Sequence, residues 1–150
     1  MRIYVDTSII NGLYTQDPRI VKITQEFLRS AKAGKFILYG STLLGDEIRQ
    51  TKDAGLRQKL IEVVEEYHVE TLPLSDEVKQ LAQIYVKEKI IPSRYLADAL
   101  HIAVATIHNI PVCVSWNFEH MVKHKTRIEV TRVNKEKGYP PIDICSPEEI

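Results

Sequence analysis

Apolar residues follow two patterns that alternate along the whole chain. Short apolar runs predict strands, clearly at residues 2–5, 36–39, 68–72 and 112–115 and more weakly at 128–133 and 142–144. Between them, apolar residues spaced three to four apart predict helices at 20–34, 42–48, 56–66, 75–85 and 94–108. Strands that alternate with helices are typical of a parallel sheet covered on both faces. The pattern therefore predicts an α/β fold, a three-layer α/β/α sandwich with a mainly parallel central sheet.

Residues that favour helix ends agree with these boundaries. Gly34 is suited to end the first helix, Ser41 or Thr42 to cap the second, and Ser75 with Val78 forms a capping signature for the fourth. No repeat, linker or shift in composition divides the chain. We therefore expect residues 1–150 to form a single domain, with the tail from about residue 121 as part of it.

Ligands of such sheets bind beyond the carboxyl ends of the strands, which makes polar residues after a strand the first candidates for a site. Asp6 follows the first predicted strand and is itself followed by the hydroxyls of Thr7 and Ser8. An aspartate in this place is equally suited to cap a helix. Glu47 lies one turn past an apolar pair in the second predicted helix and, taken alone, fits a solvated helix face.

Asp98 is the most informative acid, because helix 94–108 is apolar on nearly all sides and should be buried. An unpaired carboxylate is costly to bury, so Asp98 must be paired, protonated, or at the wall of a wet site where a cation offsets its charge. Arg94, four residues earlier, offers a simple ion pair as the alternative. His101 and His108 lie seven residues apart on one face and, with no third ligand nearby, are interpreted as core or surface histidines.

Asn117 follows the predicted strand 112–115, within Trp116-Asn117-Phe118, and is also a residue type that often caps helices. Asp6, Glu47, Asp98 and Asn117 come from four separate segments that an α/β sheet can bring to one edge. Carboxylate and carbonyl oxygens favour Mg²⁺ or Mn²⁺ over zinc. These four residues are therefore a candidate site for a hard cation.

Charge composition neither favours nor excludes a nucleic-acid partner. The chain has 20 Lys and Arg residues and 20 Asp and Glu residues, so there is no global positive field and a polyanion site must come from local asymmetry. Basic residues outnumber acidic ones in the tail, where Lys123, Lys125 and Arg127 are candidates for phosphate contacts. The same residues fit a solvated surface.

Cysteine usage and apolar content indicate the compartment. Cys113 and Cys145 have no spacing typical of zinc or redox chemistry, as expected of reduced cytosolic thiols. Asp6 interrupts what would be the apolar region of a signal peptide, and no apolar run reaches membrane-spanning length. A cytoplasmic protein without membrane association is the expectation.

Four short segments carry a resemblance to a known family. Val5-Asp6-Thr7-Ser8, Asp46-Glu47-Ile48, the segment 97–103 around Asp98, and Ser115-Trp116-Asn117-Phe118 occur in the order and spacing of the PIN domain. The chain is most similar to the VapC-like toxins, from residue 1 to about 120, and its tail is similar to that of one PIN subgroup. Each motif is short, but the four in order are fairly specific.

The resemblance implies a Mg²⁺- or Mn²⁺-dependent endoribonuclease that hydrolyses RNA phosphodiester bonds as the toxin of a type II toxin–antitoxin pair. Asp6, Glu47 and Asp98 match the three acidic, metal-binding positions, and Asn117 stands where many members have a fourth acid. Thr7 and Ser115 are candidates for hydroxyl contacts to metal, water or phosphate, although each is equally suited to bonding within a turn.

The implied partners are RNA, a second copy of the chain in a homodimer, and a cognate antitoxin. Candidate apolar contacts next to Asp6 are Ile9, Ile10, Leu13 and Tyr14, which are equally suited to the core. The alternative function is a non-catalytic or weakly active PIN module that binds RNA or a protein partner, because Asn117 removes one negative charge from the site.

Two other α/β classes with acidic pockets are disfavoured. A phosphorylation-controlled receiver domain needs an acidic pair near the end of the first strand and an acceptor aspartate after the third, but Asp6 stands alone and residues 68–73 contain no aspartate. A phosphohydrolase with an aspartyl nucleophile needs a second aspartate two residues beyond Asp6, where Ser8 stands.

Overall fold

The computed structural model describes residues 1–150 and contains one sheet of five parallel strands in the order β3-β2-β1-β4-β5. The strands are β1 (Arg2–Val5), β2 (Ile37–Ser41), β3 (Glu70–Leu72), β4 (Val112–Val114) and β5 (Asp143–Cys145). Strand β1 occupies the centre, and its Ile3 pairs with Leu38 of β2 on one side and with Val112 of β4 on the other. The all-parallel sheet confirms the predicted fold class.

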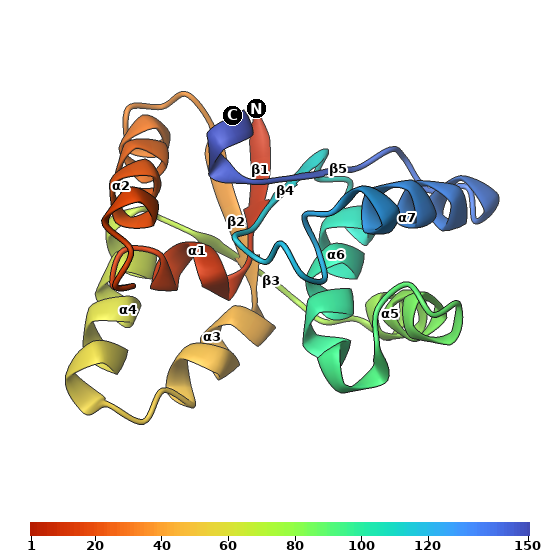
Figure 1. The fold of residues 1–150 in the computed structure, drawn as a ribbon, viewed down its shortest axis with the longest axis horizontal. Coiled ribbons are helices and arrows are strands. Elements are labelled where there is room, and N and C mark those ends of the chain that lie inside the picture. The colour runs from red at the N-terminus through yellow and green to blue at the C-terminus, as the bar shows by residue number, and fades with distance from the viewer.

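Helices cover both faces of the sheet (Figure 1). On one face lie α1 (Thr7–Asn11), α2 (Pro18–Lys32), α3 (Thr42–Arg49) and α4 (Ala54–Glu66), and on the other lie α5 (Asp76–Lys87), α6 (Leu96–Ile107) and α7 (His124–Glu136), with short 3-10 helices at η1 (Ser93–Tyr95) and η2 (Pro147–Glu149). None of the helices combines the length and the apolar composition needed to span a bilayer. The three layers are those predicted.

Alternation along β1 assigns its side chains to two separate cores. Ile3 and Val5 are buried against α1 to α4, whereas Tyr4 points to the opposite face and packs with α5 to α7. From β1 the chain proceeds outward to β2 and then β3, with the connecting helices on one face. It then returns to the other side of β1 to form β4 and β5, with the connecting helices on the opposite face. The carboxyl ends of β1 and β4 therefore form a topological switch point, where ligands of such sheets bind.

Most predicted helix ends agree with the structure. Gly34, with a φ of +86°, follows the end of α2, and the hydroxyl of Ser75 accepts the backbone N–H of Val78 at the start of α5. Ser41 occupies the N-cap position of α3 as predicted, but its side chain makes no capping hydrogen bond. Instead it accepts a hydrogen bond from Tyr4.

The strand predicted at residues 128–133 is wrong, because these residues belong to helix α7. Their β-branched residues favour a strand locally, but the buried positions Thr126, Val130 and Val133 have helical spacing and place one helix face on the core. Tertiary packing therefore overrides local preference. The other weak strand, predicted at 142–144, is confirmed as β5, which pairs with β4 and adds the tail to the sheet.

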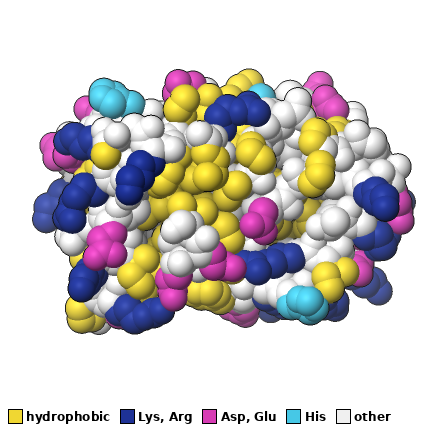
Figure 2. Space-filling model, turned by 90° about the horizontal axis from the view of Figure 1, so that it is seen from above, with side chains coloured by type: hydrophobic (Ala, Val, Ile, Leu, Met, Phe, Trp, Pro, Cys, Tyr) yellow, Lys and Arg dark blue, Asp and Glu magenta, His cyan; other side chains and the backbone are white.

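The end of the molecule that carries both chain termini has an apolar centre. Figure 2 looks onto this end and shows hydrophobic side chains gathered over the middle, with charged side chains around them. A hollow of about 640 Å³ here is lined by residues that include Met1, Phe27, Phe36 and Ile150. It lies at the amino ends of the strands, away from the polar residues that follow them.

Candidate active site

An open pocket of about 520 Å³ lies beyond the carboxyl ends of β1 and β4. Its lining contains all four residues that the sequence singled out, Asp6 after β1, Glu47 on α3, Asp98 on α6 and Asn117 after β4. The lining has three acids and no Lys or Arg, and is completed by Thr7, Ser8, Asn11, Gly12, Thr15, Ile20, Gln50, His101 and Trp116. The fold thus brings the four segments together at the switch point.

Asp6 is held as a hydrogen-bond acceptor within the pocket and does not cap α1. It occupies the N-cap position with extended backbone, but its side chain makes no capping hydrogen bond. The hydroxyl of Ser8 donates to Oδ1 at 2.5 Å and that of Ser115 donates to Oδ2 at 2.6 Å. Asp6 is only 4% exposed, and this burial raises the pKa of its carboxyl above the ordinary value in spite of the two hydroxyl donors and nearby His101.

Asp98 lies in the pocket without the ion pair that Arg94 offered. The Arg94 guanidinium instead lies over the ring of Tyr95, 5.3 Å from its centroid. Asn117 Nδ2 donates to Asp98 Oδ2 at 3.0 Å. Burial, and next the negative charge of Asp6, raise the pKa of Asp98. Two carboxylates from different elements therefore repel each other here in a partly desolvated setting.

Glu47 is turned toward the pocket, although its side chain remains 33% exposed. Its Oε1 accepts hydrogen bonds from Thr7 Oγ1 at 2.9 Å and from His101 Nε2 at 2.7 Å. Burial acts to raise the pKa of Glu47, but the hydrogen bonds and charge of His101 and the Thr7 hydroxyl outweigh it, so that the pKa lies below the ordinary value. Glu47 therefore keeps its charge to a lower pH than an ordinary glutamate, whereas the pKa values of Asp6 and Asp98 are raised.

His101 is the pocket residue whose role the sequence did not reveal. It is only 2% exposed, and its ring joins Glu47 through Nε2 and the hydroxyl of Tyr4 through Nδ1 at 2.6 Å. Its position three residues after Asp98 places both side chains on one side of α6, which was an available signal. His108, with which the pattern grouped it, bonds the carbonyl of Val104 in its own helix.

Asn117 has both roles that the sequence left open. Its Nδ2 donates to Asp98, while its Oδ1 accepts the backbone N–H of His120 at 3.0 Å and so closes the turn after β4. The Ser115 hydroxyl, besides bonding Asp6, accepts the backbone N–H of Asn117 at 2.9 Å. Thr7 and Ser115 thus both donate to pocket carboxylates.

The basic residues of the tail do not line this pocket. Lys123 and Lys125 are exposed at the beginning of α7, and Arg127 forms an ion pair with Glu149 at 2.8 Å. Of the apolar residues after Asp6, Ile9 and Ile10 are buried in the core.

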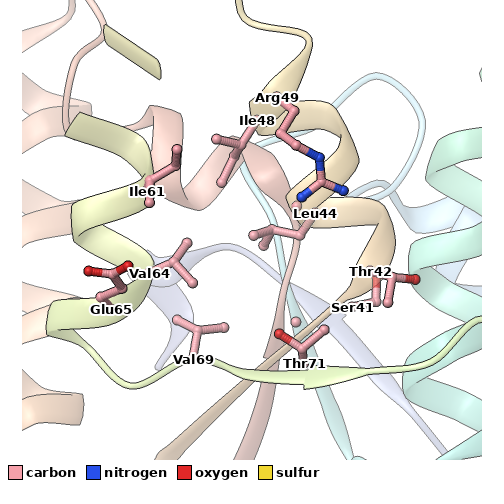
Figure 3. Close-up of a pocket in the computed structure, with 12 residues that line it drawn as sticks. Ser41, Thr42, Leu44, Ile48, Arg49, Ile61, Val64, Glu65, Val69 and Thr71 are labelled. Atoms are coloured by element: carbon pink, nitrogen blue, oxygen red, sulfur yellow. The ribbon is translucent and has the colours of Figure 1, made fainter. Parts of the chain in front are cut away.

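Helix α3 separates the acidic pocket from a smaller cavity of about 360 Å³ between α3 and α4. Figure 3 shows Leu44 of α3 and Val64 of α4 pointing toward each other across this cavity, with Ile48, Ile61 and Val69 around them. Its lining contains one acid, Glu65, and lacks the paired carboxylates of the acidic pocket.

The donor chemistry of the acidic pocket fits a hard cation. No three His, Cys, Asp or Glu side chains are grouped tightly enough to form a complete metal cluster by themselves. Mg²⁺, however, keeps several waters and needs only one or two carboxylates from the protein. Asp6 and Asp98 supply these, and their mutual repulsion is of the kind that a divalent cation relieves.

Comparison with known proteins agrees with the geometry. The family model of the PIN domain matches residues 3–115. Among solved structures, FitAcB from Neisseria gonorrhoeae shares 14% identity over 99% of both chains with a TM-score of 0.63. VapBC2 from Rickettsia felis, bound to a DNA fragment from its promoter, shares 13% identity over 97% of this chain and 98% of that chain, with a TM-score of 0.56.

A third similar structure is VapC20 from Mycobacterium tuberculosis, a sarcin-ricin loop cleaving toxin. It shares 13% identity over 79% of this chain and 92% of that chain, with a TM-score of 0.57. At these identities the likeness concerns the fold. No curated protein matches the sequence of this chain significantly.

Proposed function

The chain belongs to the PIN domain family, and from this premise we propose that it is a metal-dependent endoribonuclease acting as the toxin of a type II toxin–antitoxin pair. One observation carries the proposal, the convergence of Asp6, Glu47 and Asp98 from three elements on one open pocket at the switch point. Buried carboxylates that repel each other are costly to maintain, and such sites are typical of function. Family membership favours RNA as the substrate.

Asp6 and Asp98 are the residues that would hold Mg²⁺ or Mn²⁺ directly, and Glu47 would complete the site through a water bound to the cation. When bound, the cation supplies polarisation of a phosphoryl oxygen and a more acidic water for attack on phosphorus. The chain itself orients the carboxylates, through Ser8 and Ser115 at Asp6 and through Asn117 at Asp98. Ionised Glu47 has a free oxygen with which it can accept a hydrogen bond from a water in the pocket.

Because the pocket lining has no Lys or Arg, phosphates next to the scissile one need cations from elsewhere. We assign this role to Lys123 and Lys125, which are exposed at the start of α7. Arg127 joins them only if its pair with Glu149 opens. Thr7 and Ser115 serve the substrate indirectly, by fixing the carboxylates to which they donate.

Residues 1–150 are proposed to act as one domain, because β5 of the tail completes the sheet. The proposed partners are a second copy of the chain and an antitoxin, in the cytoplasm. The solved FitAcB and VapBC2 structures, which share this fold, support the antitoxin assignment. Tyr14, 42% exposed beside the pocket residue Thr15, is a candidate partner contact.

One observation favours a second candidate function, a PIN module that binds RNA or protein with little catalysis. Asn117 stands where many family members have a fourth acid, and its amide occupies one oxygen of Asp98. The site therefore has one negative charge fewer than the sites of those members, and the carboxylate of Asp98 already accepts a hydrogen bond. This candidate predicts RNA binding without cleavage at any Mn²⁺ concentration.

The test is cleavage of an end-labelled mixture of structured RNAs by the purified chain in a Mn²⁺ titration, with EDTA as the metal-free control. We expect metal-dependent cleavage that Asp98→Asn lowers by about 100-fold or more, the scale of a lost catalytic group. Asp143→Asn, the same change at an exposed acid of β5, is the matched control and should leave cleavage intact. Cleavage that persists in EDTA, or that Asp98→Asn does not lower, would overturn the proposal.

A further inference from the structure

We propose that His101 is a positioning residue that holds the Glu47 carboxylate in the acidic pocket, as part of a buried hydrogen-bond chain that runs from Ser41 through Tyr4 to His101 and Glu47. The inference deepens the proposed nuclease function and rests on it for the role of Glu47. His101 acts through Glu47 and needs no contact with the substrate.

The geometry fixes the direction of the decisive hydrogen bond. His101 Nε2 lies 2.7 Å from Glu47 Oε1, and an ionised carboxylate has only acceptors. The proton between them therefore belongs to Nε2, and His101 is the donor. On the other side of the ring, Nδ1 lies 2.6 Å from the hydroxyl oxygen of Tyr4, and that oxygen lies 2.9 Å from Ser41 Oγ.

The chain of hydrogen bonds joins four elements of the fold. Ser41 ends β2, Tyr4 lies in β1, His101 lies in α6 and Glu47 lies in α3. The first three side chains are buried, and Glu47 is the member that reaches the pocket. A buried, fully bonded network of this kind is rigid, so it fixes the Glu47 carboxylate relative to strands β1 and β2.

Without His101, little else would keep Glu47 in place. Glu47 has no Lys or Arg partner, and the neighbouring Arg49 is paired with Asp46. Only the hydroxyl of Thr7 would remain as a donor to its carboxylate. A glutamate side chain with a third of its surface exposed gains rotamer freedom when it is released, so we expect it to swing toward solvent.

Stability alone does not require these polar groups. Tyr4 belongs to the apolar core that α5 and α6 line, and His101 is buried between this core and the acidic pocket. Replacing both partners of a buried hydrogen bond by apolar groups of the same shape can be nearly neutral or stabilising. A function for the network explains why it is there. A single apolar replacement leaves its partner without a hydrogen bond and lowers stability, so the variants are compared per folded molecule.

The test compares His101→Gln with His101→Met. The two side chains have similar length and shape, but only Gln keeps an N–H donor for Glu47. His108→Met is the matched control, because His108 is the C-cap residue of the same helix and its side chain bonds only the backbone of that helix. The readouts are the Mn²⁺ dissociation constant by isothermal titration, and kcat and KM separately for RNA cleavage.

We expect His101→Met to weaken Mn²⁺ binding about tenfold or more and to lower kcat more than it changes KM, the scale seen when a group that orients a metal ligand is lost. His101→Gln should stay within about threefold of wild type and His108→Met should equal wild type. Equal behaviour of the Met and Gln variants, whether both impaired or both intact, would overturn the positioning role. If His101→Met fails to fold, Tyr4→Phe replaces it, with a smaller loss of the same kind expected.

Imidazole ¹⁵N NMR tests the hydrogen bond between His101 and Glu47 without metal or RNA. In the wild type we expect an immobile His101 ring with a proton on Nε2, and in Glu47→Leu we expect the ring to become mobile. A mobile ring whose state Glu47→Leu does not change would overturn the inference. A wild type that neither binds Mn²⁺ nor cleaves RNA would overturn the proposed function, and the NMR result would still decide the positioning.

Discussion

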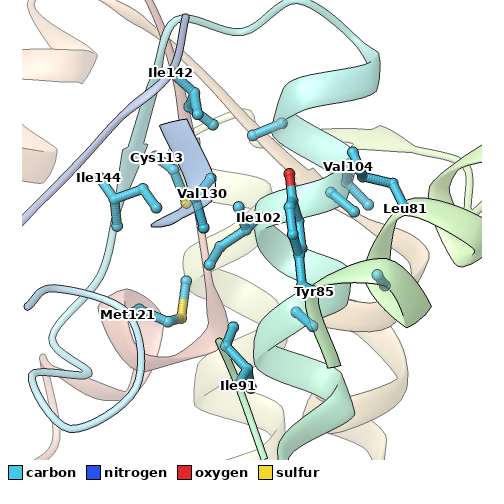
Figure 4. Close-up of a cluster of buried hydrophobic side chains, with 14 of the residues drawn as sticks. Leu81, Tyr85, Ile91, Ile102, Val104, Cys113, Met121, Val130, Ile142 and Ile144 are labelled. Carbon is cyan, nitrogen blue, oxygen red and sulfur yellow. The ribbon is translucent and has the colours of Figure 1, made fainter. Parts of the chain in front are cut away.

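Helix α6 contributes to two buried polar clusters that differ in charge. Near its end, Thr106 joins Tyr85 of α5 and Asn134 of α7 in a core triad, in which Tyr85 donates to Asn134 Oδ1 at 2.5 Å and Asn134 Nδ2 donates to Thr106 at 3.2 Å. Figure 4 shows Tyr85 among the apolar side chains of this core. Near its beginning, Asp98 and His101 face the acidic pocket.

The core triad is explained by the fold alone. Its members are neutral, are bonded to one another, and connect the three helices on one face of the sheet. The acidic pocket is not explained in this way, because burial and like charge raise the pKa of Asp98, and burial raises that of Asp6. Satisfied polar groups indicate architecture, and strained charges indicate a site.

The largest difference between the two clusters should appear in cleavage activity and stability when the charge of Asp98 is removed. Asp98→Asn is expected to reduce metal-dependent cleavage by about 100-fold or more while leaving the melting temperature of the metal-free protein unchanged or raised, since repulsion from Asp6 is relieved. Thermal melts in EDTA, run beside the cleavage assay, measure both. A strongly destabilised variant that still cleaves would mean that Asp98 has a structural role.

The opposite result is expected for the core triad. Tyr85→Phe leaves Asn134 Oδ1 without its donor, which should lower the free energy of unfolding by about 1–3 kcal/mol. Cleavage per folded molecule should not change, because Tyr85 does not line the pocket. Urea unfolding gives the first quantity and the assay below the transition gives the second. A loss of cleavage without a loss of stability would break the distinction between the clusters.

Asn117→Asp adds charge to the pocket and should sharpen the contrast. The new carboxylate loses the donated bond to Asp98 and repels it, so the metal-free protein should be less stable. Mn²⁺ should bind several-fold more tightly because another anionic ligand is available. Titration calorimetry and melts with and without Mn²⁺ measure the two effects. Unchanged affinity with a simple loss of stability would assign Asn117 to the turn alone.

The smallest effect is on the pH dependence of stability. Asp6 and Asp98 have raised pKa values in the folded state, so their contribution to the stability of the metal-free protein is full below the ordinary value of 3.8 and is lost as the pH rises through the raised values. Glu47, with a lowered pKa, acts in the opposite direction and loses its contribution as the pH falls. Unfolding curves in EDTA from pH 4 upward should therefore show that the free energy of unfolding declines less steeply with pH for Asp98→Asn than for wild type. The same dependence of this free energy on pH in both proteins would contradict the raised pKa of Asp98.

Much of the fold could be predicted from the sequence because periodicity and helix-end residues are local signals. The five strands of the sheet were predicted, and Asp6 and Asn117 could be placed at the carboxyl ends of β1 and β4 for the same reason. The failure at 128–133 has the complementary cause, since the fit of α7 onto the core overrides the strand preference of its β-branched residues.

The connections within the site could not be predicted, because they join residues far apart in the sequence. Tyr4 and His101 are 97 positions apart, and Asp6 and Ser115 are 109 apart. The spacing of three residues from Asp98 places His101 on the pocket side of α6, but no local pattern tells that its partner is Glu47 of α3. The residue types were available from the sequence, whereas their hydrogen-bond partners required the fold.

The central claim is that the acidic pocket, unlike the core triad, is built for a divalent cation, and the stabilisation of folding by Mn²⁺ tests it most directly. At a Mn²⁺ concentration about 100 times the dissociation constant, wild type should gain about 2.7 kcal/mol in the free energy of unfolding. Tyr85→Phe should gain the same amount from its lower baseline, and Asp98→Asn should gain little. Equal gains in wild type and Asp98→Asn, or no gain in wild type, would contradict the account.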